Sequence, residues 1–438
     1  MLLNAADKAL WRLALPMIFS NITVPLLGLV DTAVIGHLDS PVYLGGVAVG
    51  ATATSFLFML LLFLRMSTTG LTAQAWGAKD PQRLARALVQ PLALALGAGV
   101  LIILLRLPLI DLALHIVGGS EAVLEQARRF LEIRWLSAPA SLANLVLLGW
   151  LLGVQYARAP VILLVLGNLL NIVLDLWLVM GLRMNVQGAA LATVTAEYAT
   201  LIIGLLMAKR VLTLRGVSLA MLKNAWRGDL RRLLALNRDI MLRSLLLQLC
   251  FGALTVFGAR LGSDIVAVNA VLMTMLTFTA YALDGFAYAV EAHSGQAYGA
   301  RDGSQLLEVW RAACRQSGMV ALAFALIYSL AGQYIIALLT SLPSLQQLAD
   351  RYLIWQTILP VVGVWCYLLD GMFIGATRGA EMRNSMAVAA AGFAVTLLTL
   401  PVLGNHGLWL ALAVFLALRG LSLALIWRRH WRRGTWFS

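Results

Sequence analysis

Two apolar stretches of this sequence carry carboxylates and amides at spacings that suit proton or cation chemistry. Asn168, Asn171 and Asp175 are spaced i, i+3 and i+7, so they share one face of a helix. Thr193 and Glu197, spaced i and i+4, form a second polar stripe in the next apolar stretch. A carboxyl group surrounded by amides and hydroxyls in an apolar setting can bind and release a proton. The alternative is that these groups only join neighbouring helices by hydrogen bonds.

Asp31 is a third acidic candidate. Like Asp175 and Thr193, it lies about five or six residues from the end of its apolar stretch, a depth of about 8–9 Å at 1.5 Å per residue. A charged side chain at a bilayer centre costs roughly 2.5–3.5 kcal/mol, so it is usually retained for function. Burial and a second nearby carboxylate both favour the neutral acid. We therefore predict Asp31 and Asp175 as proton-coupling residues, with Asn168, Asn171, Thr193 and Glu197 as the supporting network.

Pro25 weakens the helix that carries Asp31. Its nitrogen has no hydrogen to donate to the carbonyl of Asn21, and it precedes Asp31 by about one and a half turns. We expect Pro25 to act as a hinge whose bend changes when Asp31 is protonated. A static kink is the alternative.

The composition places these residues in a membrane. Hydrophobic residues make up 61% of the 438 residues and charged residues 12%, whereas soluble domains carry about 25% charged residues. The mean hydropathy is +0.86. One water-soluble core cannot bury so much apolar surface, so we expect an all-α polytopic membrane protein. The three cysteines lack metal or redox spacing, and we expect no metal and no cofactor.

Twelve apolar runs are long enough to cross a bilayer, which takes about 20 helical residues. With the N-terminus inside, the inner segments carry 23 Lys and Arg residues and the outer segments seven. The positive-inside rule therefore predicts two cytoplasmic termini, and it accounts for the net charge of +13 without nucleic acid. The runs are 10–36, 43–66, 88–107, 125–153, 159–181, 187–208, 239–260, 264–291, 309–337, 347–376, 384–403 and 406–427.

A basic loop divides these spans into six and six. We predict an N-terminal six-helix lobe at 1–210, a cytoplasmic basic linker at 211–237 and a C-terminal six-helix lobe at 238–438. The linker contains Trp226 and is expected to lie on the inner membrane surface as a short amphipathic stretch.

The two halves repeat one polar segment. "QAWGAKD", starting at Gln74, aligns with "QAYGARD", starting at Gln296, an offset of 222 residues. Each copy follows the second span of its half. Six is an even number, so both halves enter the membrane from the same side, and a pseudo-two-fold axis along the membrane normal should relate them. That arrangement is typical of alternating-access transporters.

These features together resemble the MATE family of multidrug and toxic compound extrusion transporters, and within it the DNA-damage-inducible branch. The resemblance rests on the six-plus-six plan, the two repeated loops, "LVDTAVIGHL", "GNLLNIVLDLWLVMG" and "VQGAALAT". It implies the MATE fold and a secondary antiporter in the bacterial cytoplasmic (inner) membrane. Such a protein exports organic, often cationic and amphipathic compounds in exchange for protons or sodium ions. We expect small-molecule substrates, a lipid bilayer, no nucleic acid and a monomer.

The resemblance also implies residue roles. Proton-linked members are thought to use the carboxylate that matches Asp31, with the positions matching Asn171, Asp175 and Thr193 as its polar neighbours. All four residues are present. Sodium-linked members use a carboxylate matching Asp370 and a glutamate at the position of Gln248. Because Gln248 is neutral, we favour H+ over Na+ as the coupling ion.

The C-terminal half of the chain offers a candidate substrate cavity. One apolar span carries aromatic and acidic side chains on a continuous stripe, consisting of Tyr281, Asp284, Tyr288 and Glu291. Aromatic rings and carboxylates together suit a lipophilic cation. Asp370 and Gln248 complete the set of cavity candidates, and Glu291 has the alternative of a solvated end residue.

Other classes fit less well. A lipid-linked precursor flippase of the wider superfamily is the main functional rival, but it should present more cationic residues to its cavity than Arg65 and Arg243. A major-facilitator transporter shares the six-plus-six plan, but its loop signature is absent. The motifs of metalloproteases, α/β-hydrolases and P-loop ATPases are also absent, so we expect neither an enzyme nor an ATP-driven pump.

Overall fold

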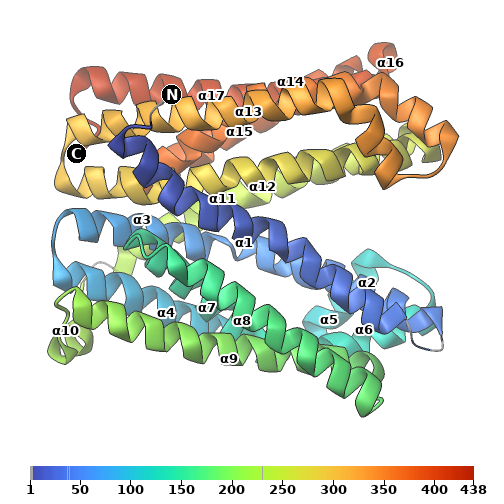
Figure 1. Ribbon diagram of the computed structural model, residues 1–438, viewed down its shortest axis with the longest axis horizontal. Helices are drawn as coiled ribbons and strands as arrows, with labels where there is room; N and C mark the ends of the chain where they lie inside the picture. Colours follow the sequence, from blue (N-terminus) through green and yellow to red (C-terminus); the bar gives the residue numbers. More distant parts are fainter. Residues whose placement is uncertain (1–2, 37, 39, 229) are drawn as a thin grey trace. The chain divides into compact units, whose positions relative to one another are not determined.

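Every regular element in the described part of the chain is a helix (Figure 1). The computed structural model describes residues 3–36, 38, 40–228 and 230–438, and it describes no side chains for 24–33. Within these described residues, eleven helical segments, from Pro41–Gly77 to Asn405–Arg433, are long and apolar enough to cross a membrane. The remaining predicted span falls within α1 (Ala5–Gly36), a helix of 32 residues. The predicted all-α class is confirmed.

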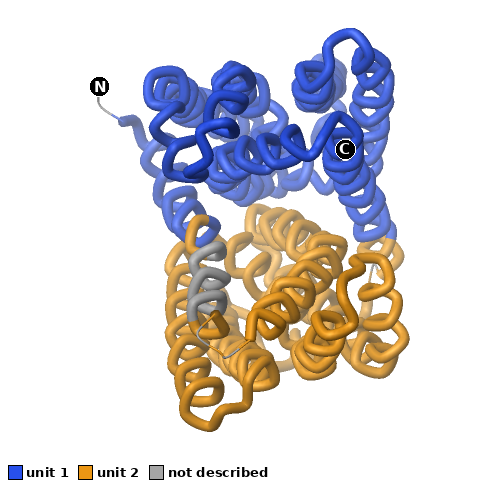
Figure 2. The backbone as a smooth tube through the Cα atoms, turned by 90° about the vertical axis from the view of Figure 1, so that its right-hand side faces the viewer, with its two compact units in different colours: residues 1–21, 235–438 blue, residues 22–234 orange. Residues whose placement is uncertain are grey.

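The chain forms two compact units, which Figure 2 distinguishes by colour. One unit comprises residues 22–234 and the other comprises 1–21 and 235–438, so the first helix is divided between them. Besides its part of α1, the first contains α2 (Pro41–Leu60), α3 (Phe63–Gly77), α4 (Pro81–Leu104), α5 (Arg106–Val117), α6 (Glu121–Arg134), α7 (Ala138–Gly153), α8 (Arg158–Asp175), α9 (Asn185–Leu214) and α10 (Leu219–Asn224). The second contains α11 (Leu230–Leu261), most of which belongs to it, α12 (Ser263–Ala300), α13 (Gly303–Leu339), α14 (Pro343–Gly375), α15 (Gly379–Thr396), α16 (Leu400–Leu403) and α17 (Asn405–Arg433).

The repeated polar segment forms the same helix–turn–helix in both units. Lys79 and Arg301 both have a φ of 53°, a left-handed conformation that ends a helix. The backbone N–H groups of Asp80 and Asp302 donate to the carbonyl five residues earlier, at 3.2 and 3.0 Å. Each aspartate then caps the next helix, because its carboxylate accepts the backbone N–H three residues on, at 3.2 Å in the first copy and 3.1 Å in the second. The repeat therefore encodes a sharp reversal between two spans.

A close helix crossing also recurs in both units. α7 ends in "GWLLG" and α14 ends in "GMFIG", a small-residue spacing that lets helix backbones approach. A Cβ on Gly153 would lie 2.7 Å from the side chain of Thr72 on α3. A Cβ on Gly375 would lie 2.5 Å from the hydroxyl of Ser294 on α12. Both pairs keep the 222-residue offset, so the repeat extends from the loops into the packing of the spans.

Candidate functional site

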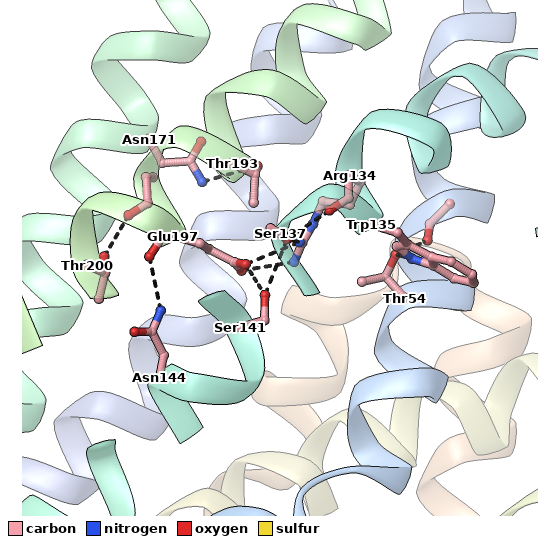
Figure 3. Close-up of polar contacts among 12 residues, drawn as sticks. Thr54, Arg134, Trp135, Ser137, Ser141, Asn144, Asn171, Thr193, Glu197 and Thr200 are labelled. Carbon is pink, nitrogen blue, oxygen red and sulfur yellow. Dashed lines mark hydrogen bonds and ion pairs between the residues drawn. The ribbon is translucent and has the colours of Figure 1, made fainter. Parts of the chain in front are cut away.

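The polar stripes of α8 and α9 meet in the unit formed by residues 22–234. Asn171 on α8 donates a hydrogen bond from Nδ2 to Oγ1 of Thr193 on α9, at 3.4 Å (Figure 3). The Thr193 hydroxyl in turn donates to the carbonyl of Ala189, at 3.2 Å. Asn171 is 2% exposed and Thr193 is 8% exposed. Asn171 and Thr193, which the family resemblance places in one polar group, are thus in direct contact inside the bundle.

Asp175 is the buried acid of this arrangement. It is the last α-helical residue of α8, one turn beyond Asn171, and it is 1% exposed. The chain then widens into a π-helical segment, Leu176–Gly181, a conformation that is rare and often found at functional sites. The Asp175 carboxyl group is thus enclosed by protein at the junction between an α-helix and a π-helical segment.

Glu197 lies one turn beyond Thr193 on α9, but its partners differ from those of Thr193. Its carboxylate pairs with the guanidinium of Arg134 at the end of α6, with Nη2 to Oε1 at 3.0 Å. The hydroxyl of Ser141 also donates to this carboxylate, and Asn144 donates to the Glu197 backbone carbonyl at 3.2 Å. Figure 3 shows the Glu197 side chain directed towards Arg134 and Ser141. An arginine therefore compensates the charge of Glu197, which the sequence analysis did not anticipate.

The structure says less about the other candidate residues of the N-terminal half. Asn168 is partly exposed on α8, one turn before Asn171. Asp31 and Pro25 lie on α1, but their side chains are outside the described residues. The proposed coupling role of Asp31 and the hinge role of Pro25 therefore stay predictions.

The predicted aromatic and acidic stripe lies along α12. Tyr281, Asp284 and Tyr288 are partly buried, and Glu291 is 2% exposed. Glu291 is thus enclosed by protein, and its alternative as a solvated end residue does not describe its surroundings. Gln248, on α11, is also partly buried. The role of these residues as a substrate cavity stays a prediction.

Asp370 on α14 lies between two arginines. Arg243 of α11 donates from Nη2 to Oδ2 of Asp370 at 2.5 Å, and Arg419 of α17 donates to the same oxygen. The three side chains are between 5% and 10% exposed. Two buried cations hold one carboxylate, so its charge is more than compensated locally. The sequence analysis considered Arg243 only as a cationic cavity residue of a flippase, and it missed Arg419. The signal that could have revealed both is an arginine within an apolar span.

The fold and these buried ionisable groups define a polytopic helical membrane protein of the transporter class. Comparison with known proteins then identifies the family. The MatE family model matches residues 16–177 and 240–403, so the chain belongs to the MATE family of multidrug efflux transporters. Family membership makes it a transporter rather than an enzyme.

Individual relatives agree with this assignment. The chain is 87% identical over 436 residues to the DNA damage-inducible protein F of Escherichia coli (strain K12), covering 100% of this chain and 95% of that protein. It is 23% identical to the probable multidrug resistance protein NorM of Acinetobacter baylyi, covering 96% and 94%. A crystal structure of MATE in the bent conformation matches the fold with a TM-score of 0.85 at 24% identity, over 98% of this chain and 96% of that one.

Proposed function

We propose that this protein exports lipophilic organic cations in exchange for protons by alternating access. The observation that carries the proposal is the burial of Asp175 beside the Asn171–Thr193 hydrogen bond. A nearly inaccessible carboxyl group changes its proton occupancy when water or a cation reaches it. We assign Asp31 to the same site from the sequence, and Pro25 to the hinge of α1.

The relatives support the substrate class. The Acinetobacter relative is named a probable multidrug resistance protein, and a Staphylococcus aureus relative, 23% identical over 385 residues, is named multidrug export protein MepA. In this chain the α12 stripe offers phenol rings with carboxylates close by. Rings bind an apolar cation through dispersion and cation–π attraction, while the acids supply the opposite charge.

The surroundings of Asp370 favour protons over sodium as the coupling ion. A sodium ion needs open oxygen ligands and uncompensated negative charge, but Asp370 accepts from both Arg243 and Arg419. Gln248 adds no charge. The same pairing weighs against the flippase alternative, because these two buried cations already face a carboxylate and are poorly placed to hold a pyrophosphate.

The energetics limit the exchange ratio. Each proton that enters contributes about 2.3 kcal/mol per 100 mV of membrane potential and about 1.4 kcal/mol per pH unit. Exchange of one monovalent cation for one proton cancels the voltage contribution and leaves about tenfold accumulation per pH unit. Two acids in one site permit a second proton, which would recover the voltage contribution.

We further propose that the protein is a monomer in the bacterial inner membrane with both termini in the cytoplasm. The uneven distribution of Lys and Arg supports this orientation, and the Escherichia coli relative supports a bacterial membrane.

Proteoliposomes test the proposal. Vesicles loaded with ethidium, a lipophilic cation, should release it when an inward proton gradient is imposed, and an added sodium gradient should not change the rate. Asp175→Asn and Asp31→Asn should each abolish gradient-driven release. Asp264→Asn is the matched control, because Asp264 is exposed at the start of α12. Release that follows sodium instead of ΔpH would refute the coupling assignment.

A further inference from the structure

The unit formed by residues 22–234 contains a basic cavity that the transport proposal does not use. Its volume is about 170 Å³. α3, α4 and the start of α11 line it. Three of its eight lining residues are arginines, and none of the eight is an acid. The lining consists of Leu71, Arg83, Arg86, Ala87, Gln90, Pro91, Arg232 and Leu233.

The arginines of this cavity repel one another. The positive charges of Arg86 and Arg232 repel the guanidinium of Arg83. Among the described residues, the Asp80 carboxylate attracts it. The Asp80 carboxylate already accepts the backbone N–H groups of residues 82 and 83 as the cap of α4. Arg232 donates to the neutral amide of Gln74 at 3.4 Å. Mutual repulsion of this kind is relieved when an anion binds among the guanidinium groups.

The linker between the two halves forms one side of this region. Gln90 donates to the backbone carbonyls of Ala225 and Trp226, at 3.3 and 3.4 Å, and Gln82 donates to the carbonyl of Met221 at 3.3 Å. α10 therefore packs on α4 where α4 begins (Figure 1). These glutamines fix the linker beside the arginines.

The same linker exposes large apolar side chains. Leu219 is 68% exposed and Trp226 is 63% exposed. A tryptophan with one polar edge favours the boundary between headgroups and acyl chains, where basic side chains also meet anionic lipid. Exposed apolar groups beside a cationic cavity at the end of a span match the chemistry of a phospholipid, with a charged phosphate above an apolar body.

We propose that this cavity binds the phosphate of an anionic phospholipid through Arg83, Arg86 and Arg232, while Leu219 and Trp226 of the linker enter the membrane interface. Arginine binds phosphate oxygens by paired N–H donors, and basic pockets at the ends of membrane helices recognise anionic headgroups. The bound lipid bridges α4 and α11, so it fastens the linker to the first bundle. This site is separate from the acids of α8 and α9, and the proposal does not depend on the coupling ion.

Lipid-dependent thermal stability tests the site on the full-length protein in detergent. Dioleoyl phosphatidylglycerol should raise the Tm of the wild type by at least about 2 °C, as a specific ligand does, and dioleoyl phosphatidylcholine should not. The triple variant Arg83→Gln, Arg86→Gln, Arg232→Gln should lose this shift. The matched control is Arg311→Gln, Arg428→Gln, Arg429→Gln, which removes the same charge from exposed positions of the other unit and should keep it.

Two further measurements distinguish binding of the lipid from misfolding of the variant and from binding of free phosphate. Native mass spectrometry should count one fewer retained phosphatidylglycerol in the single variant Arg86→Gln, which guards against misfolding of the triple. Inorganic phosphate alone should leave the Tm unchanged. An unchanged lipid shift in the triple variant, an equal loss in the control, or a full shift with inorganic phosphate would each overturn the proposal.

Discussion

Arg134 and Glu197 form an ion pair between α6 and α9, with Nη2 of the arginine 3.0 Å from Oε1 of the glutamate. Their side chains are 11% and 25% exposed. The pair lies one helical turn from Thr193, which hydrogen-bonds Asn171. The ion pair therefore lies close to the Asn171–Thr193 contact, and Asp175 follows Asn171 by one turn of α8. We interpret the pair as a structural clamp that keeps α9 in register with α6, and the proposed proton exchange is assigned to Asp175 instead.

The clamp predicts a defined mutational pattern. Glu197→Gln and Arg134→Gln should each lower stability by about 2 kcal/mol, because each leaves a largely buried partner without its counter-charge. The double variant should lose less than the sum of the two. Thermal unfolding in detergent measures all three. Additive losses would show that the two side chains do not stabilise each other.

The close glycine crossings of the two units predict that a Gly→Ala substitution destabilises the protein at the crossing but not at glycines that face open space. Gly153→Ala and Gly375→Ala should destabilise by about 1–3 kcal/mol, because each methyl group meets the neighbouring helix at less than 3.0 Å. Gly97→Ala and Gly318→Ala are the controls, since a Cβ at either position has nothing within 4 Å. Both controls should be neutral or gain up to about 1 kcal/mol from helix propensity. Equal Tm changes at all four positions would contradict the close crossing.

The arginine pair on Asp370 predicts that this acid is structural. Asp370→Asn should lower stability by about 3–5 kcal/mol, because Arg243 and Arg419 would remain buried without a counter-charge. Replacing choline chloride by sodium chloride should not change the Tm of the wild type. A sodium-dependent Tm increase that Asp370→Asn abolishes would instead identify Asp370 as a sodium ligand.

The sequence predicted the helical spans well, because span length follows directly from the thickness of the bilayer. The cytoplasmic placement of both termini, which rests on the charge bias, stays a prediction. The all-α class is confirmed. Helical spacing put Asn171 and Thr193 on the polar stripes of two different helices, and it was the family resemblance that grouped them; the structure has them in contact. The lobe limits at 210 and 238 stay predictions. Packing groups the chain differently at its start, where residues 1–21 join the second half.

Some features of the protein could not be predicted from the sequence and are seen only in the structure. Arg134 is one of the seven basic residues of the outer segments. Only the packing of α6 on α9 shows that it reaches Glu197. The repeat also continues in turns whose sequences differ, because Gln155 and Thr377, again 222 residues apart, have φ values of 63° and 54°. Backbone geometry is conserved between these two turns without matching residue types, so no sequence pattern revealed it.

Proton release on substrate binding tests the central assignment most directly. Tetraphenylphosphonium, a lipophilic cation, should release protons from the detergent-solubilised protein in a weakly buffered solution with a pH dye, because a cation in the site displaces protons from its acids. Asp175→Asn should bind the cation and release fewer protons, whereas Asp264→Asn should behave as the wild type. Cation binding without proton release in the wild type, or undiminished release in Asp175→Asn, would contradict the account.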